Sequence, residues 1–189
     1  MNRGYFQKFQ IKDVVFLAIM SAVVLATCAV MPLVISLQPL IFGISQLVTA
    51  LQIGVFFAIG LYKVRKPGSL LIMALMMGLI QLMMSPPMFL SSVLNGVLIE
   101  LIVLLLFRGY EKDAAVFVAA MLHTPLSLPF NYLYNRLVKG ADSPLAAVAD
   151  RAPLAAVGMT LAVVAVSALG ALIGIKIARE LKKSGVLKK

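Results

Sequence analysis

Residues 88–107 read MFLSSVLNGVLIELIVLLLF, and Glu100 is the one charged side chain among them. A helix that crosses the hydrocarbon core of a bilayer needs roughly 20 mostly apolar residues. In lipid the backbone must satisfy its own hydrogen bonds, and a helix does so within a single segment. This stretch therefore predicts a membrane-spanning helix with one acidic group inside it.

The same pattern continues along the rest of the chain. Of its 189 residues, 62% are hydrophobic and 13% are charged, whereas a soluble domain is about half apolar and a quarter charged. Apolar runs between the charges predict an all-α, polytopic membrane protein with six transmembrane helices in a single domain, 1–189. The predicted spans are 14–37, 38–62, 67–84, 88–107, 114–134 and 153–175, with a turn at 36–39 between the first two.

The basic residues predict the orientation. Of 17 Lys and Arg residues, 14 fall in the N-terminal arm, the connections after the second and fourth spans, and the tail. Cytoplasmic loops carry an excess of Lys and Arg, so both termini are expected in the cytoplasm. The net charge of +10 then reflects topology and contact with anionic lipid, and nucleic-acid binding is not expected. The longest outer connection is 135–152, and its part 141–149 tolerates helix and is expected to cover the outer face.

Missing motifs narrow the function. The chain has no G-x-x-x-x-G-K-[ST] phosphate loop, no H-E-x-x-H and no G-x-S-x-G, with one His and one Cys. ATP hydrolysis by that loop and a histidine-ligated protease are therefore excluded. We expect no enzymatic activity, no metal site and no cofactor of its own.

Two ionisable residues lie inside predicted spans. Glu100 and His123 fall at comparable depths on the fourth and fifth spans. Such groups are costly in a membrane and are functional candidates by default. The alternative is a structural Glu–His or Glu–backbone pair that holds these two helices together.

Further polar residues share helix faces with these two. His123, Ser127, Asn131 and Tyr134 form one stripe, on a segment interrupted by Pro125 and Pro129. Ser92, Gly96 and Glu100 form another, with Asn95 beside it. Together these eight residues predict a small-molecule site in the outer halves of spans four to six. The alternative is a kinked helix whose polar groups bond to its own backbone. For Ser45, Thr49 and Gln52, on one face of span two, interhelical bonding is favoured over ligand contact.

Small residues mark packing faces. Ala18, Ala22 and Ala26 form a ladder on the first span, and Gly170 and Gly174 form a G-x-x-x-G on the last. Small side chains let helices approach closely in lipid. Packing within the bundle accounts for both, but the alanine ladder also suits docking of a separate membrane subunit.

With these features the sequence resembles the substrate-binding (S) components of energy-coupling factor vitamin importers. The resemblance covers the six-span topology and an A-x-x-x-A on the first helix, here Ala18-Ile19-Met20-Ser21-Ala22. It implies a prokaryotic plasma-membrane protein whose alanine face meets a transmembrane coupling subunit, with ATP used only by two partner ATPases. A narrower similarity, to hydroxymethylpyrimidine/thiamine-related S components, rests on Arg65-Lys66-Pro67-Gly68 and on Asn95-Gly96-x-x-x-Glu100 followed by Arg108. Asn95 departs from the Gln expected there.

The resemblance implies a vitamin-binding subunit that captures its ligand from outside. A carboxylate such as Glu100 can pair with the amidine-like edge of an aminopyrimidine through two hydrogen bonds. Two other functions stay open. One is a stand-alone secondary transporter or channel that uses Glu100 and His123 to relay protons. The other is a membrane enzyme that uses the same pair for acid–base chemistry.

Overall fold

The computed structural model describes residues 8–28, 34, 36–140 and 143–187. Within these ranges the chain forms seven helices and no strand, which confirms the predicted all-α class. The helices are α1 (Ile11–Thr27), α3 (Ile44–Val64), α4 (Ser69–Leu82), α5 (Pro86–Phe107), α6 (Asp113–Val138), α7 (Pro144–Arg151) and α8 (Pro153–Lys183).

Four of these helices, α3, α5, α6 and α8, are long and apolar enough to cross a membrane. The other two apolar helices are shorter, with 17 residues in α1 and 14 in α4. At 1.5 Å per residue these lengths correspond to about 26 Å and about 21 Å, against a hydrocarbon core of roughly 30 Å. The helices are those of a multi-pass membrane protein.

The largest difference from the predicted spans lies between the first two. The first helix, α1, ends at Thr27 and α3 begins at Ile44, so the connection is much longer than the predicted turn at 36–39. Gly43, the N-cap of α3, has a φ of 75°, a left-handed conformation that glycine adopts without steric cost. The helix α1 thus ends before the predicted limit at 37, and Ser36 and Leu37 lie in turns, whereas residues 29–33 and 35 of the predicted span lie outside the described residues. By contrast, α6 and α8 continue past their predicted ends.

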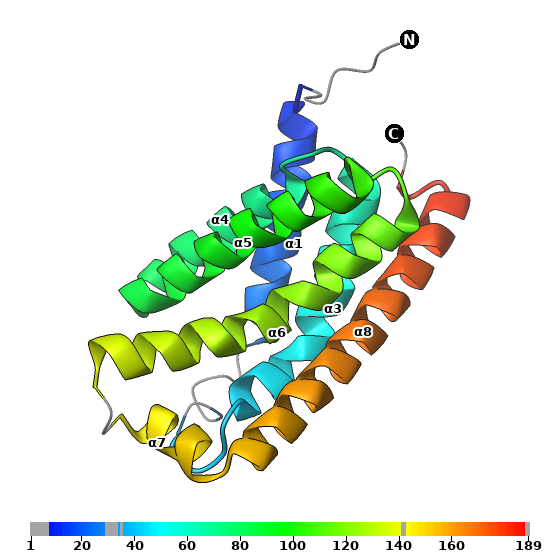
Figure 1. Cartoon of the computed structure of the whole chain (residues 1–189). Helices are drawn as coiled ribbons and strands as arrows, with labels where there is room; N and C mark the ends of the chain where they lie inside the picture. Colours follow the sequence, from blue (N-terminus) through cyan, green and yellow to red (C-terminus); the bar gives the residue numbers. More distant parts are fainter. Residues whose placement is uncertain (1–7, 29–33, 35, 141–142, 188–189) are drawn as a thin grey trace.

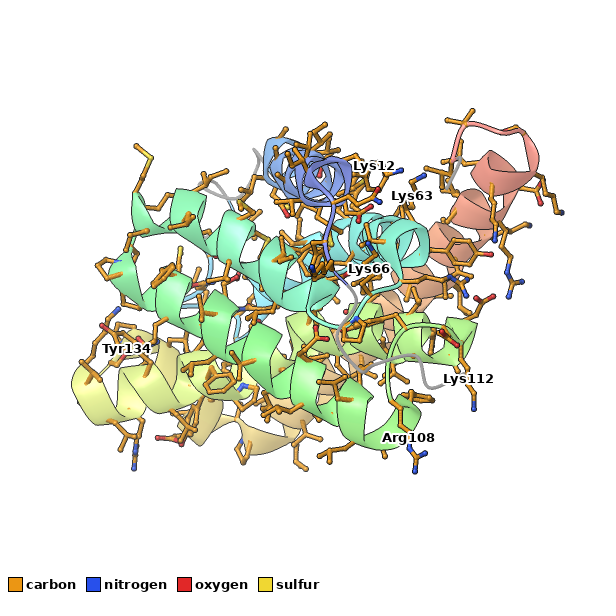
Figure 2. The ribbon with its side chains drawn as sticks, turned by 90° about the horizontal axis from the view of Figure 1, so that it is seen from above. Lys12, Lys63, Lys66, Arg108, Lys112 and Tyr134 are labelled. Carbon is orange, nitrogen blue, oxygen red and sulfur yellow. The ribbon has the colours of Figure 1, made fainter. Side chains whose placement is uncertain are left out.

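The two ends of the bundle differ in charge. The start of α1 and the end of α8 lie at the same end, together with the α3–α4 and α5–α6 connections (Figure 1). Figure 2 views the molecule from this end and shows Lys12, Lys63, Lys66, Arg108 and Lys112 over these elements, with Tyr134 away from them. The helix α7 lies at the opposite end (Figure 1). The end that was predicted to be basic and the end that was predicted to face outward are thus opposite ends of the bundle.

Small residues bring pairs of helices close together. A Cβ added at Gly170 on α8 would lie 2.5 Å from the backbone oxygen of Leu51 on α3, and one at Gly174 would collide with that of Val55. The G-x-x-x-G of the last span therefore packs α8 along α3, within the bundle. On α1, the Ser21 hydroxyl donates to the backbone oxygen of Met73 on α4 at 3.1 Å.

Ion pairs fasten the basic end. Asp113, the first residue of α6, accepts from Arg65 after α3 and from Arg179 on α8, the latter at 2.6 Å. Lys66 donates to Asp13 of α1 at 2.6 Å. These pairs join four helices at the end opposite α7.

Candidate functional site

A cavity of about 840 Å³ occupies the half of the bundle near α7. Residues of α1, α3, α4, α5, α6 and α7 line it, and none of its lining residues belongs to α8. The prediction that spans four to six form the pocket is therefore wrong for the sixth. Because α8 packs along α3 through glycine, it lies behind the cavity wall.

The mouth of the cavity lies between three connections. Pro39 before α3, Met84 before α5 and Lys139 after α6 line it, and all three are exposed. Ser143 and Leu145, at the start of α7, complete the rim. The predicted helix at 141–149 thus corresponds from Pro144 onward to α7 at the cavity mouth, and residues 141 and 142 lie outside the described residues.

Contacts to α6 hold α7 in place. The Tyr132 hydroxyl donates to Asp150 at 2.7 Å, and Arg136 forms an ion pair with the same carboxylate. Near the start of α7, the Ser143 hydroxyl donates to the side-chain oxygen of Asn135 at 2.9 Å. These three contacts place α7 against the C-terminal end of α6.

The inner part of the cavity contains three polar side chains with buried atoms that have no hydrogen-bond partner among the described residues. Asn95 of α5 and His123 and Thr124 of α6 are 1%, 3% and 2% exposed, and all three line the cavity. Asn95 Oδ1, both ring nitrogens of His123 and Thr124 Oγ1 have no hydrogen-bond partner among the described residues. We call these three residues the inner cluster. Buried polar atoms are nearly always hydrogen-bonded, so an unsatisfied cluster on a cavity is where a ligand or water is expected.

An aromatic contact helps to position His123. Its ring meets that of Phe57 on α3 edge to face, with the centroids 4.6 Å apart. Neither ring nitrogen has a hydrogen-bond partner among the described residues. His123 is therefore packed through its ring and available through its polar atoms.

Six of the eight predicted site residues line this cavity, and some already have backbone partners. They are Ser92, Asn95, His123, Ser127, Asn131 and Tyr134. The Ser92 hydroxyl donates to Ala74 of α4 at 3.0 Å, and that of Ser127 to Thr124 at 2.7 Å. These two hydroxyls retain only their acceptor capacity for a ligand.

Glu100 does not line the cavity. Its Oε1 accepts from the backbone N–H of Gly68 at 2.6 Å, and its Oε2 accepts from the Tyr110 hydroxyl at 2.9 Å. Gly68 precedes α4 with a φ of 92°, so this carboxylate binds the N-terminus of α4. Burial and the neighbouring Glu100 raise the pKa of Tyr110. The structure thus shows a structural Glu–backbone contact, but it joins α5 to the start of α4 rather than to α6 as the alternative for Glu100 supposed, and the described residues include no hydrogen bond from Glu100 to His123.

Gly96 also lies outside the cavity lining. A Cβ at this position would lie 2.6 Å from Cβ of Ala74, so the missing side chain lets α4 and α5 pack closely. Its place on the same face as Ser92 is as predicted, but that face meets α4 rather than open space.

Sequence reasoning missed several lining residues. Thr124 belongs to the inner cluster, and its position beside His123 was the available signal. Ser45 and Thr49 of α3 also line the cavity, although interhelical bonding was favoured for them. The Ser45 hydroxyl does donate to Gln46 at 2.8 Å, and that of Thr49 to its own helix backbone at 2.9 Å. Their contacts are thus within or beside α3, next to the cavity.

The alanine ladder of α1 faces away from the bundle. Ala22 and Ala26 are exposed and Ala18 is partly exposed, whereas Leu17, Ser21 and Val24 are buried. Packing within the bundle therefore does not account for Ala22 and Ala26, and this face is free for lipid or another subunit.

Comparison with known proteins relates the chain to one protein family. A family model described as "Hypothetical bacterial integral membrane protein (Trep_Strep)" matches residues 11–183, nearly the whole chain. No curated protein and no solved structure matches.

Proposed function

Because the chain belongs to the Trep_Strep family of hypothetical bacterial integral membrane proteins, and because it contains a cavity with unsatisfied polar groups, we propose that it captures a small molecule at the membrane. In this proposal it is the substrate-binding (S) component of an energy-coupling factor importer in the plasma membrane. Its ligand is a small water-soluble vitamin or vitamin precursor.

The inner cluster carries this proposal. Leaving a buried donor or acceptor without a partner costs about 1–3 kcal/mol, and the cluster has four such atoms. A ligand that pairs with them recovers this cost on binding. The cavity volume of about 840 Å³ also lies in the range of small-molecule sites, roughly 300–1,000 Å³.

Topology supports capture from outside. With the basic end in the cytoplasm, the cavity mouth beside α7 faces the exterior. In this arrangement α1 and α4 cross the membrane together with the four longer helices, and the chain ends return to the cytoplasm. A hydrophobic helix shorter than the bilayer core is accommodated by local thinning of the bilayer.

Energy has to come from partners in this proposal. The sequence has no phosphate loop, and the exposed alanines of α1 offer a surface on which a membrane subunit can pack closely. By the resemblance, this subunit is the coupling protein, which two ATPases drive. Inward release of the ligand then depends on that complex.

Hydroxymethylpyrimidine is the ligand that the narrower resemblance implies. Sequence reasoning gave Glu100 the pairing with its amino group, and Glu100 is bound to α4 and Tyr110 instead. In the present proposal Asn95 Oδ1 takes that role, with His123 and Thr124 completing the contacts. A proton relay from Glu100 to His123 has no hydrogen-bonded connection among the described residues, so we do not develop the stand-alone transporter further.

Two measurements test the proposal. Mass spectrometry of the purified protein should detect a bound small molecule, with retention at least about tenfold lower in Asn95→Leu or His123→Phe. Ser167→Ala is the matched control, since Ser167 Oγ is also buried and unpaired but does not line the cavity. Equal retention in all variants would contradict the site.

The second measurement addresses the partners. Uptake by cells should require the ATPases and should be lost in Ala22→Trp, with ligand retention unchanged. ATP-dependent uptake that persists in Ala22→Trp would contradict docking through α1. Uptake driven by the proton gradient, without ATPases, would contradict the importer itself.

A further inference from the structure

The charged and polar groups around the cavity restrict the class of ligand more narrowly than the volume of the cavity does. We propose that the inner cluster accepts an uncharged, ring-sized molecule with at least one N–H or O–H donor, and that the cavity rejects cations. This inference rests on the proposed function, because it names the class of molecule that the cavity would capture.

The hydrogen-bonding capacity of the inner cluster is mixed. Asn95 Oδ1 can only accept, so it requires a donor from the ligand. An uncharged imidazole such as that of His123 provides one donor and one acceptor, and the Thr124 hydroxyl can do either. A ligand that satisfies all four atoms must therefore offer both donors and acceptors, as amides, aminopyrimidines and hydroxymethyl groups do.

Among the described residues, no carboxylate lines the cavity. The described side chains around it include no Asp or Glu, and Glu100, the nearest in sequence to the inner cluster, has both oxygens bonded at the other end of the bundle. A cation at the inner cluster would thus lose its hydration without gaining a counter-charge, which is strongly unfavourable in a buried site.

Lys139, the one charged residue among the described lining residues, strengthens this discrimination against cations. Lys139 is exposed at the mouth, with its ammonium nitrogen 5.9 Å from the ring centroid of Tyr134. A cation that enters past Lys139 meets a like charge before it reaches the cavity. An anion is attracted at the mouth but finds no cation among the polar groups of the inner cluster, so the group bound there is uncharged.

The apolar walls favour a ring. Ile53 of α3 and Met77 of α4 line the cavity among its polar residues. A flat ring presents apolar faces to such side chains and polar edges to the cluster. This matches the combination of apolar lining and few polar anchors that is typical of small-molecule sites.

Two matched pairs of probes test the inference on the full-length protein in phosphatidylcholine nanodiscs. Hydroxymethylpyrimidine and thiamine share an aminopyrimidine ring, and thiamine adds a cationic thiazolium. Nicotinamide and 1-methylnicotinamide differ by one methyl group and a fixed positive charge. Binding is measured by native mass spectrometry at up to millimolar concentration. We expect at least one neutral probe to bind more than about tenfold tighter than its cationic partner.

Three variants identify the residues responsible. Asn95→Asp places a carboxylate in the inner cluster and should reduce or reverse the preference for the neutral probe. Thr124→Val keeps the shape of the side chain and should weaken binding of the neutral probe alone. Lys139→Gln, at an exposed position that leaves folding intact, should reduce the difference in binding affinity between the neutral and the cationic probe of each pair.

The outcomes separate this inference from the function. A cationic probe that binds wild-type protein as tightly as its neutral partner overturns the inference and leaves capture of a small molecule standing. Failure of both neutral probes to bind also overturns it, since each has the size and donor that the cluster requires. Mass spectrometry of the small molecules released from the purified protein tests independently whether the protein captures any ligand.

Discussion

Replacing Glu100 with Gln should destabilise the protein without weakening ligand binding. This carboxylate accepts a hydrogen bond from Gly68 N–H on Oε1, at 2.6 Å, and from the Tyr110 hydroxyl on Oε2, at 2.9 Å. A Gln side chain has one oxygen, and its NH2 group would face the other donor. One of the two donors is then left without a partner.

The expected loss of stability follows from this one unpaired donor. An unpaired buried donor costs about 1–3 kcal/mol. For a chain of this size about 1 kcal/mol lowers the midpoint of thermal unfolding by about 2–4 °C, so we expect a decrease of the order of 5 °C. Tyr110→Phe leaves Oε2 of Glu100 without this donor, so a cost of the same order, about 1–3 kcal/mol, is expected.

A fluorogenic thiol-reactive dye provides the assay. Cys28 is the single cysteine and is buried at the wall of the cavity, so the dye reacts slowly with the folded protein and faster when the protein unfolds. Binding is followed in parallel by mass spectrometry, with Asn95→Leu as the comparison on the same helix. The two variants should show opposite patterns, with stability lost in Glu100→Gln and retention lost in Asn95→Leu. If Glu100→Gln unfolds at the wild-type temperature but no longer retains ligand, our assignment of this carboxylate to α4 is refuted.

Three further predictions concern packing, the basic end and topology. Gly170→Val should lower stability by about 1–3 kcal/mol in the same unfolding assay, because its side chain would meet the α3 backbone; unchanged unfolding would disprove the close contact. Asp113→Asn should cost no more than about 1 kcal/mol, since its ion pairs with Arg65 and Arg179 are partly exposed; a larger loss would indicate a buried network. In a Cys28→Ser background, a membrane-impermeant maleimide should label Lys139→Cys but not Ser184→Cys in intact cells; the reverse would invert the topology.

The sequence was sufficient to predict a helix and its polar face where polar groups interrupt an apolar helix. The fourth span was predicted at 88–107 and is observed as α5, Pro86–Phe107. The stripe from His123 to Tyr134 follows α6 and lines the cavity along its length. In both helices the periodicity of polar residues identifies a face, and in lipid a polar face requires a partner, a ligand or water.

Two features were beyond the reach of periodicity. The face that carries Glu100 was identified, but its partners, Gly68 and Tyr110, lie in connections whose positions depend on tertiary packing. Likewise, hydropathy does not distinguish an apolar helix from an apolar turn, so Ser36 and Leu37, which lie in turns before α3, were assigned to the first span. Only the relative placement of the helices decides both questions.

Asp150 has a consequence for how molecules pass the cavity mouth. Both of its partners, Tyr132 and Arg136, lie on α6, so α7 is tied to the helix that also supplies His123 and Thr124. A displacement of α7 must therefore either break these contacts or carry the outer end of α6 with it. In the second case α7 at the cavity mouth would move together with His123 and Thr124 of α6. The rate of ligand exchange would then be coupled to the affinity for the ligand.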